Sequence, residues 1–320
     1  MHAIRIEKHG GPEVMQWTEL PDPVPGPGEV LVRLRAAGVN YMDVGARAVG
    51  GPGWAAPAVL GVEGMGHVTS LGEGVRDLAV GDRVAWFYHP GSYAELLAVP
   101  AEALVKVPDG IDDETAAAVM MQGLTASHLS TETYPIGPGD TALVHAAAGG
   151  VGRLLTQLVK ARGGRVIGLV SRAEKAAVAE EAGADHVLVH SGGGFEGRIR
   201  ELTGGQGVDV VYDGGGGGTF HSSQAALRPH GVHAYYGPFM GVPTLRPTDL
   251  PNSILLTYPV VHHHVATREA LLRRTGELFA LVLDGRLTPR VTGRHPLADA
   301  ARAHADLESR RTTGKLLLLP

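Results

Sequence analysis

The first 120 residues alternate apolar and polar side chains in short stretches that glycine and proline separate. The stretch EVLVRLRAAGV, residues 29–39, alternates as a half-buried strand requires, and the PDPVPGPG before it is typical of turns. Two more strands are expected around the glycine-rich turns of residues 68–87, and another in SYAELLAVP, residues 92–100. This part of the chain is therefore predicted to be a small β-rich domain.

From about Thr125 the pattern changes to short apolar runs that alternate with helical stretches. The runs TALVH, RVIGLV, HVLVH, VDVVYD and GVHAYY are expected strands, and RAEKAAVAEEAG, residues 172–183, is an expected helix. This alternation predicts an α/β fold, a parallel sheet with helices on both faces. After about residue 260, two more helices are expected in REALLRRTGELFALVLDG and LADAARAHADLESR, and a last strand in GKLLLLP.

Composition and charge narrow the class of protein. The 320 residues are 44% hydrophobic, enough for two domains or one large one, and the net charge of −5 gives no reason to expect nucleic acid as a partner. The absence of cysteine rules out disulfides and thiolate ligands and fits a reducing compartment. The N-terminus lacks the apolar core of a signal peptide, and no run approaches the ~20 apolar residues of a membrane span. We expect a cytoplasmic protein that does not bind membranes.

The stretch HAAAGGVGRLLTQLVK, which begins at the end of the expected strand TALVH, combines a glycine-rich turn with the start of a helix. Gly149 and Gly152 occupy the last two positions of the dinucleotide fingerprint G-x-G-x-x-G, and Ala147 stands at the first. Glycines there let backbone amides approach a pyrophosphate and let the helix pack closely on the strand. The alternative is a tight strand-to-helix turn that binds no ligand.

The residues after the next expected strand, RVIGLV, discriminate between the two nicotinamide cofactors. NAD binding calls for an acidic residue about 20 residues after the glycines, whereas this chain has Ser171, Arg172 and Lys175. A hydroxyl and two cations suit the 2′-phosphate of NADPH, and cations are otherwise unfavourable at a helix N-terminus. NADPH is therefore the expected cofactor, and a solvated helix start is the alternative interpretation.

Three consecutive histidines, His262 to His264, invite a metal hypothesis. Consecutive side chains point in different directions, so these three cannot ligate one ion without help from other residues. We expect no metal here, and expect the histidines to lie at a surface between domains or in the lining of a pocket.

The turn PGPGEVLVRLRAAGVN, the stretch GVEGMGHVTSLGEGVRDLAVGDRV, the AAAGGVG turn and the closing LESRRTTGKLLLLP together resemble the medium-chain dehydrogenase/reductase superfamily. Within it the chain is similar to the zinc-free quinone oxidoreductases related to zeta-crystallin. The resemblance implies a GroES-like domain of residues 1–123 with 262–320, a Rossmann domain with a doubly wound parallel sheet of residues 124–261, and a homodimer. Zinc-dependent relatives have cysteine and histidine where this chain has Asn40 and Val62, so a reaction without zinc is expected.

The resemblance also implies which residues contact the cofactor. They are Asn40 and Thr125 at the nicotinamide, Gly149, Gly150 and Val151 at the pyrophosphate, Ser171, Arg172 and Lys175 at the 2′-phosphate, His190 near the adenine ribose, Gly215 and Gly237 where a side chain would block the cofactor, and Arg310 reaching back from the C-terminal segment. As alternatives, Asn40 and Thr125 could satisfy backbone groups, and the glycines could be turn residues.

The substrate side of the site departs from the family. Gln122 replaces a lysine common in bacterial members, and Tyr41 and Trp54 are expected to supply the aromatic surface that tyrosines supply elsewhere. No Ser-His-Asp order, carboxylate pair or Lys-Tyr dyad emerges, so no catalytic residue is assigned. A quinone tolerates this absence, because it accepts hydride readily and takes protons from water once the nicotinamide is held against it in a dry cleft.

The expected function is NADPH-dependent reduction of a quinone or related conjugated carbonyl, in the cleft between the two domains. One alternative is an enoyl or alkenal reductase, which adds hydride to an activated C=C bond and benefits from a proton donor, for which Tyr41 is the candidate. Another is a non-catalytic sensor or structural protein that keeps NADPH without turnover.

Overall fold

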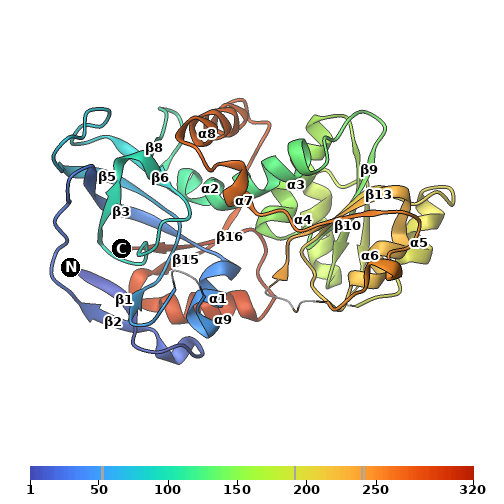
Figure 1. Cartoon of the computed structure of the whole chain (residues 1–320), viewed down its shortest axis with the longest axis horizontal. Helices are drawn as coiled ribbons and strands as arrows, with labels where there is room; N and C mark the ends of the chain where they lie inside the picture. Colours follow the sequence, from blue (N-terminus) through green and yellow to red (C-terminus); the bar gives the residue numbers. More distant parts are fainter. Residues whose placement is uncertain (52–53, 191, 239–240, 242) are drawn as a thin grey trace. The chain divides into compact units, whose positions relative to one another are not determined.

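The computed structural model describes residues 1–320 except 52–53, 191, 239–240 and 242, and it divides into two compact units (Figure 1). The terminal unit consists of Met1–Met121, Val265–Asp284 and Pro289–Pro320. The central unit consists of Gln122–His264 and Gly285–Thr288. Both ends of the colour scale in Figure 1 therefore fall in the terminal unit, and the greens and yellows fall mainly in the central unit.

The larger sheet of the terminal unit has strand order β15-β16-β3-β5-β6-β8, with β7 also paired to β3. These strands are β3 (Glu29–Val39), β5 (Gly64–Leu71), β6 (Arg83–Trp86), β7 (Leu96–Pro100), β8 (Val105–Lys106), β15 (Val291–Pro296) and β16 (Lys315–Leu319). In β3 the buried Val30, Val32 and Leu34 alternate with more exposed residues, which confirms the predicted half-buried strand. The last strand, β16, pairs antiparallel with β3.

A second sheet and further helices belong to the described part of the terminal unit, which also holds the first turns of α2 (Asp113–His128). The sheet has the order β2-β1-β4, with β1 (His2–Ile6), β2 (Gln16–Glu19) and β4 (Ala58–Val59). The helices are α1 (Tyr41–Val49), α8 (Arg268–Leu283) and α9 (Ala300–Glu308). The last two confirm the helices predicted after residue 260. Side chains from both sheets and from α9 share one apolar core, which includes Ile4, Trp86 and Ala303.

The central unit is a doubly wound α/β domain with six parallel strands in the order β11-β10-β9-β12-β13-β14. The strands are β9 (Thr141–His145), β10 (Arg165–Val170), β11 (His186–Val189), β12 (Val208–Asp213), β13 (Leu227–Tyr235) and β14 (Leu255–Thr257). The helices are α3 (Gly150–Ala161), α4 (Ala176–Glu181), α5 (Glu196–Leu202), α6 (Phe220–Ala226) and α7 (Val261–His264). The five predicted strands are confirmed; β13 starts earlier than expected, and β14 was not predicted.

The order of the strands determines where a ligand can bind to the central unit. From β9 the chain proceeds to β10 and β11 on one side, and β12, β13 and β14 are added on the other side of β9. Because all six strands are parallel, their carboxyl ends lie at one edge. The crevice at this edge where the order reverses, between β9 and β12, is the usual ligand site of such sheets.

Helix α2 (Asp113–His128) lies in a region where no helix was predicted from the sequence. Its residues from Ala116 to Met121 are all buried, so the helix has no exposed polar face over this stretch and shows no amphipathic period. Among the described helices, none combines the length and the apolar character that crossing a membrane requires.

Candidate functional site

The glycine turn follows β9 directly and is fixed by contacts that leave no room for side chains. Ala146, the first residue after the strand, has a φ of 48°, and its carbonyl oxygen accepts a hydrogen bond of 2.7 Å from the Gly149 amide. A Cβ atom on Gly152 would lie 2.3 Å from the same oxygen. Gly149 is the N-cap of α3, so the N-terminus of this helix lies at the carboxyl edge of the sheet.

The first turn of α3 has the properties of an anion-binding site. The first amides of a helix have no intrahelical acceptor, and the helix dipole places partial positive charge at the same end. Gly150 and Val151 are only partly buried there. A Cβ on Gly150 would lie 1.9 Å from Oε1 of Gln122, so the Gln122 side chain lies against the turn. Thr125 follows three residues later on α2 and therefore shares a face of that helix with Gln122.

The three residues predicted for the 2′-phosphate lie together after β10. Ser171 and Lys175 are partly buried, and Arg172 is exposed. Arg172 lies 3.8 Å from Glu174, an exposed contact that leaves the guanidinium accessible to a ligand. One turn of 3-10 helix, Ala173–Lys175, precedes α4, so the two cations lie just before the α-helix rather than inside it.

His190 follows β11 and lies at the same edge of the sheet. Its amide donates to the carbonyl oxygen of Val170, at 2.7 Å, which ties it to the end of β10. Its Nδ1 accepts a hydrogen bond from the Gly192 amide, at 3.2 Å, and its ring meets the ring of Phe195 edge-on with centroids 5.7 Å apart. These contacts hold the imidazole in one orientation.

Gly215 and Gly237 follow β12 and β13, and the protein itself requires both to be glycine. A Cβ on Gly215 would lie 2.7 Å from His145 Nδ1 and 2.7 Å from Thr219 Oγ1. A Cβ on Gly237 would lie 2.7 Å from the backbone of Gly214. The sequence had suggested only that a side chain would obstruct a ligand at these positions.

A buried polar cluster beneath these glycines was missed by the sequence analysis. Ser223 Oγ lies 3.0 Å from His145 Nε2 and 2.8 Å from Asp213 Oδ2, and His233 Nε2 lies 3.2 Å from the same carboxylate oxygen. Nδ1 of His145 is 3.3 Å from Asp213 Oδ1. All four side chains are essentially inaccessible to solvent. The available signal was that the apolar strands β9 and β12 both end in a polar residue.

The protonation of this cluster follows from its contacts. Burial opposes ionisation of Asp213, but the neighbouring His145 and the hydrogen bonds from His233 and Ser223 outweigh it and lower the pKa of the carboxyl to about 2. Burial also lowers the pKa of His145, so this imidazole is neutral at pH 7. An ionised carboxylate only accepts, so Ser223 Oγ and His233 Nε2 both donate to Asp213.

In the terminal unit, Asn40 belongs to a buried ion-pair network. Its Nδ2 donates to Glu63 Oε2, at 2.9 Å, and its Oδ1 accepts from Lys315 Nζ, at 2.8 Å. Lys315 also donates to Glu63, and the other oxygen of Glu63 accepts from the Met121 amide, at 2.7 Å. Asn40 is the N-cap of α1, and its side-chain amide is thus fixed from two sides.

Tyr41 and Arg310 lie close together in the terminal unit, and Trp54 lies on a separate loop. The Tyr41 hydroxyl donates to the carbonyl oxygen of Leu307, at 3.0 Å. Burial raises the pKa of Tyr41, and the charge of Arg310 opposes that increase. Trp54 is half-buried, and its amide donates to the Gly51 carbonyl oxygen, at 2.9 Å.

The histidine run forms the short helix α7, and its members have different neighbours. His264 Nδ1 is 2.5 Å from Glu132 Oε2, and its ring stacks on His128 with centroids 4.2 Å apart. Within the described part of the chain, no three histidine or carboxylate side chains are arranged to hold a metal ion.

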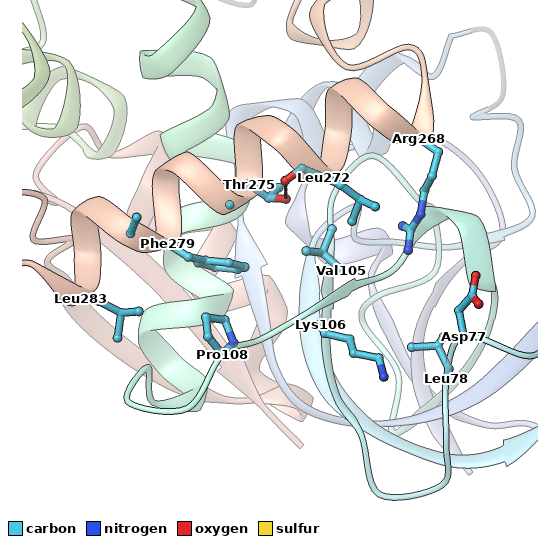
Figure 2. A pocket seen from close by; sticks show the side chains of 12 residues that line it. Asp77, Leu78, Val105, Lys106, Pro108, Arg268, Leu272, Thr275, Phe279 and Leu283 are labelled. Carbon is cyan, nitrogen blue, oxygen red and sulfur yellow. Dashed lines mark hydrogen bonds between the residues drawn. The ribbon is translucent and has the colours of Figure 1, made fainter.

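The terminal unit also has an apolar groove of about 720 Å³ along α8 (Figure 2). Apolar side chains of α8 and of the segments opposite line it: Leu272, Phe279, Leu283, Leu78 and Val105. Arg268 lies at one end and donates to the carbonyl oxygen of Glu102, at 2.8 Å. None of the residues predicted to contact cofactor or substrate lines this groove, so it is not part of the candidate site.

A GroES-like strand arrangement together with a doubly wound sheet that carries a glycine turn defines a dehydrogenase of the medium-chain type. Residues 26–109 match the family model of the alcohol dehydrogenase GroES-like domain, and residues 150–272 match that of the zinc-binding dehydrogenases. The quinone oxidoreductase of Pseudomonas aeruginosa is 41% identical over 99% of both chains, and a 2-haloacrylate reductase of a Burkholderia species is 39% identical over 99% of this chain and 98% of its own. The chain belongs to the quinone oxidoreductase family of the medium-chain dehydrogenase/reductase superfamily.

Solved structures agree with this assignment over the whole chain. A mycobacterial protein solved in complex with NADPH superimposes with a TM-score of 0.96, at 45% identity, and the match covers 100% of both chains.

Proposed function

We propose that this protein reduces quinones or related conjugated carbonyls with NADPH, without zinc. The observation that carries the proposal is the carboxyl edge of the central unit, where the N-terminus of α3, a pair of cations and two closely packed glycines follow four strands of one sheet. The relative of known structure with 45% identity binds NADPH, and the relative with 41% identity is a quinone oxidoreductase.

The edge of the central unit suits the shape and charge of NADPH. Amides of Gly150 and Val151, beside Gly149, would bind the pyrophosphate, because the first amides of a helix have no intrahelical acceptor. A Cβ on Gly152 would lie 2.3 Å from the carbonyl oxygen of Ala146, so the shape of this turn depends on glycine at that position.

The residues after β10 and β11 would bind the adenosine half. Ser171, Arg172 and Lys175 would bind the 2′-phosphate, because a dianion is recognised best by charge-assisted hydrogen bonds. His190, held at one orientation, would lie near the adenine ribose. Gly215 and Gly237, which follow β12 and β13 on the other side of β9, are proposed as positions where a side chain would block the cofactor.

The remaining proposed contacts concern the nicotinamide and the substrate. Thr125 of the central unit and Asn40 and Arg310 of the terminal unit are proposed to contact the cofactor, and Tyr41 and Trp54 to contact the substrate. When bound, NADPH supplies a hydride, and with one proton from water this completes the two-electron reduction of a quinone to a hydroquinone. The protein's own residues then act by binding and orientation, which suffices for so reactive an acceptor.

The position of Asn40 supports a reaction without zinc. Both heavy atoms of its side-chain amide are engaged by Glu63 and Lys315. Val62, where zinc-dependent relatives have a histidine, is fully buried and offers no ligand atom.

A second candidate is reduction of an activated C=C bond, which the 39% identity to a 2-haloacrylate reductase favours. This reaction requires a proton at the carbon that does not receive the hydride. Tyr41 is the candidate donor, and its hydroxyl would have to exchange its bond to the Leu307 carbonyl for one to the substrate.

We further propose a homodimer and a cytoplasmic location, as the family resemblance implies. β14 is an edge strand of the six-stranded sheet, and Leu255 and Tyr258 are exposed there, which suits pairing with a second copy. Light scattering on the purified protein should give twice the mass of one chain, and fractionation of cells should recover it with the cytoplasmic enzymes.

The experiment that tests the proposed function is a titration of the purified protein with NADPH and with NADH, followed by 1,4-benzoquinone. We expect tighter binding of NADPH and loss of the nicotinamide absorbance only after the quinone is added. Tight binding without turnover of quinones or enones would contradict the proposed reaction, and no binding of either nucleotide would contradict the cofactor site.

A further inference from the structure

The buried cluster of His145, Asp213, Ser223 and His233 lies at the point of the sheet where strand order reverses. His145 is the last residue of β9 and Asp213 is the last residue of β12, and these neighbouring parallel strands pair up to Tyr212 and Val144. The two residues therefore lie at the carboxyl ends of the strands between which a sheet of this type usually binds its ligand.

The cluster joins four separate segments of the central unit through one carboxylate. Asp213 accepts from the Gly215 amide, at 2.8 Å, in the loop after β12, and from Ser223 Oγ, at 2.8 Å, on α6. It also accepts from His233 Nε2, at 3.2 Å, on β13. His145 contributes β9 through its bond to Ser223.

The order Ser-His-Asp does not make this cluster a nucleophilic triad. Ser223 is completely buried, so no substrate can reach its Oγ. Its Oγ lies 2.8 Å from Asp213 Oδ2 and 3.0 Å from His145 Nε2, so it links these two buried side chains. The contacts therefore fix positions and do not activate an oxygen.

The loop of five consecutive glycines, residues 214–218, is the segment whose conformation depends most on such contacts. Glycine has the largest backbone freedom of any residue, so an unanchored run of five would sample many conformations. Several contacts hold this run: Gly215 bonds to Asp213, the Gly216 carbonyl oxygen accepts from Thr219, the Gly217 amide donates to the Gly241 carbonyl oxygen at 3.0 Å, and Gly214 packs against the backbone of Gly237.

The anchor at Gly215 is the one made by a charged group. A hydrogen bond to an ionised acceptor is stronger than one between neutral groups, and Asp213 stays ionised over the whole physiological range because its pKa is about 2. The missing side chain at Gly215 lets the backbone approach, since a Cβ would lie 2.7 Å from His145 Nδ1.

We propose that Asp213, held by Ser223 and His145, is a positioning residue that orders the 214–218 loop at the cofactor crevice before NADPH binds. This inference rests on the proposed function, because it names the part of the protein that prepares the same site. A loop that is already ordered loses less conformational entropy when NADPH binds. The Asp213 network therefore affects the affinity for NADPH and not the rate of hydride transfer once NADPH is bound.

The experiment compares Asp213→Asn and Ser223→Ala with the wild-type protein, and uses Ser130→Ala as the matched control. Ser130 is an equally buried serine of the central unit, and within the described residues its hydroxyl donates to the carbonyl oxygens of Ala126 and Ser127. The first readout is hydrogen exchange of the peptide that contains residues 214–218, measured by mass spectrometry without nucleotide. The second is the Kd for NADPH together with kcat for 1,4-benzoquinone at saturating NADPH.

We expect faster exchange of the loop and a rise of about fivefold to tenfold in Kd for both variants, the scale of one lost hydrogen bond, with kcat within about twofold of wild type. Hydrogen exchange of the β9 peptide should be unchanged in every variant. The control Ser130→Ala should match the wild-type protein in loop exchange, Kd and kcat. If Asp213→Asn does not fold, Ser223→Ala alone decides the outcome. Unchanged exchange and Kd, or a fall in kcat with Kd unchanged, would overturn the inference. Failure of the wild-type protein to bind NADPH would overturn the proposed function as well, whereas normal wild-type binding without a response in the variants overturns the inference alone.

Discussion

Lys315, the first residue of the last strand, donates a hydrogen bond of 2.8 Å to the side chain of Asn40, 275 positions earlier in the chain. Lys315 also forms a fully buried ion pair with Glu63. The C-terminal strand thereby determines the orientation of a residue proposed to contact the cofactor.

Replacing Lys315 by methionine should destabilise the protein strongly, because Glu63 would remain as an uncompensated buried charge. We expect a loss of about 3–5 kcal/mol in the free energy of unfolding, measured by urea denaturation. The double variant Lys315→Met/Glu63→Gln should recover most of this loss. If the free energy of unfolding of Lys315→Met lies within about 1 kcal/mol of the wild-type value, the loss is no larger than that of an exposed ion pair. The Lys315–Glu63 pair would then not stabilise the fold.

Removal of the cations after β10 should change the choice of cofactor. For Arg172→Ala and Lys175→Ala we expect Kd for NADPH to rise about tenfold or more and Kd for NADH to stay nearly constant, since only the 2′-phosphate distinguishes the two. Arg198→Ala, which removes an exposed arginine paired with Glu201, is the control. Equal changes in Kd for NADPH and NADH would show that Arg172 and Lys175 do not contact the 2′-phosphate.

Gly152→Ala should damage both the fold and the cofactor site. Its Cβ would lie 2.3 Å from the carbonyl oxygen of Ala146, and backbone cannot move aside as a side-chain end can. We expect a loss of about 1–3 kcal/mol in stability and a large loss of NADPH affinity. The matched control is Gly197→Ala on α5, where a Cβ meets nothing within 4 Å and a small gain in stability is expected. A stable Gly152→Ala protein with wild-type affinity would contradict the proposed turn.

The stability of the terminal unit should depend on pH through His304. Burial, together with the charge of Arg47, lowers the pKa of His304 to about 3, well below its value of about 6.5 in an unfolded chain. Between about pH 6.5 and 3, His304 therefore binds a proton in the unfolded chain but stays neutral in the folded protein. The free energy of unfolding falls as the pH drops through this range.

This dependence can be isolated with His304→Gln. Burial raises the pKa of the nearby Asp43 to about 7, an effect of opposite sign, but Asp43 is present in both proteins and largely cancels in their difference. Wild type should lose up to about 1.4 kcal/mol per pH unit relative to the variant below pH 6.5. Parallel stability curves between pH 7 and 4 would show that His304 does not titrate as described.

Tyr41→Phe separates the two candidate reactions. The change removes a hydroxyl that is bonded to Leu307, so a small loss of stability, about 1 kcal/mol, is expected in any case. Quinone turnover should remain near wild type, because a quinone needs no protein proton donor. If turnover of an enone falls at least about 100-fold while quinone turnover is retained, Tyr41 is the proton donor for that reaction. Equal effects on both substrates would assign Tyr41 a packing role only.

Local patterns were sufficient to predict much of the central unit. β9 and β10 have the predicted bounds, and the turn that follows β9 is glycine-rich because its backbone approaches itself too closely for side chains. Such features depend on residues that are near one another in the sequence. Helix α2 was not predicted, because it is buried on all sides from Ala116 to Met121. Amphipathic periodicity indicates only helices that have one exposed face.

The contacts of the site were harder to predict, because they join residues far apart in the sequence. Ser223 meets His145 across 78 positions and Lys315 meets Asn40 across 275. A lone polar residue at the end of a strand gives no indication of its partner. A cofactor contact for Asn40 was expected only through the family resemblance, and its bonds to Glu63 and Lys315 were not foreseen.

The central claim is tested most directly by a single turnover. Protein saturated with one equivalent of NADPH is mixed with one equivalent of 1,4-benzoquinone, and the nicotinamide absorbance and the hydroquinone are followed together. The account predicts that one hydroquinone forms for each NADPH consumed, and that the rate far exceeds that of the same mixture without protein. A nicotinamide band that decays no faster with protein than without it, while NADPH stays bound, would contradict the account.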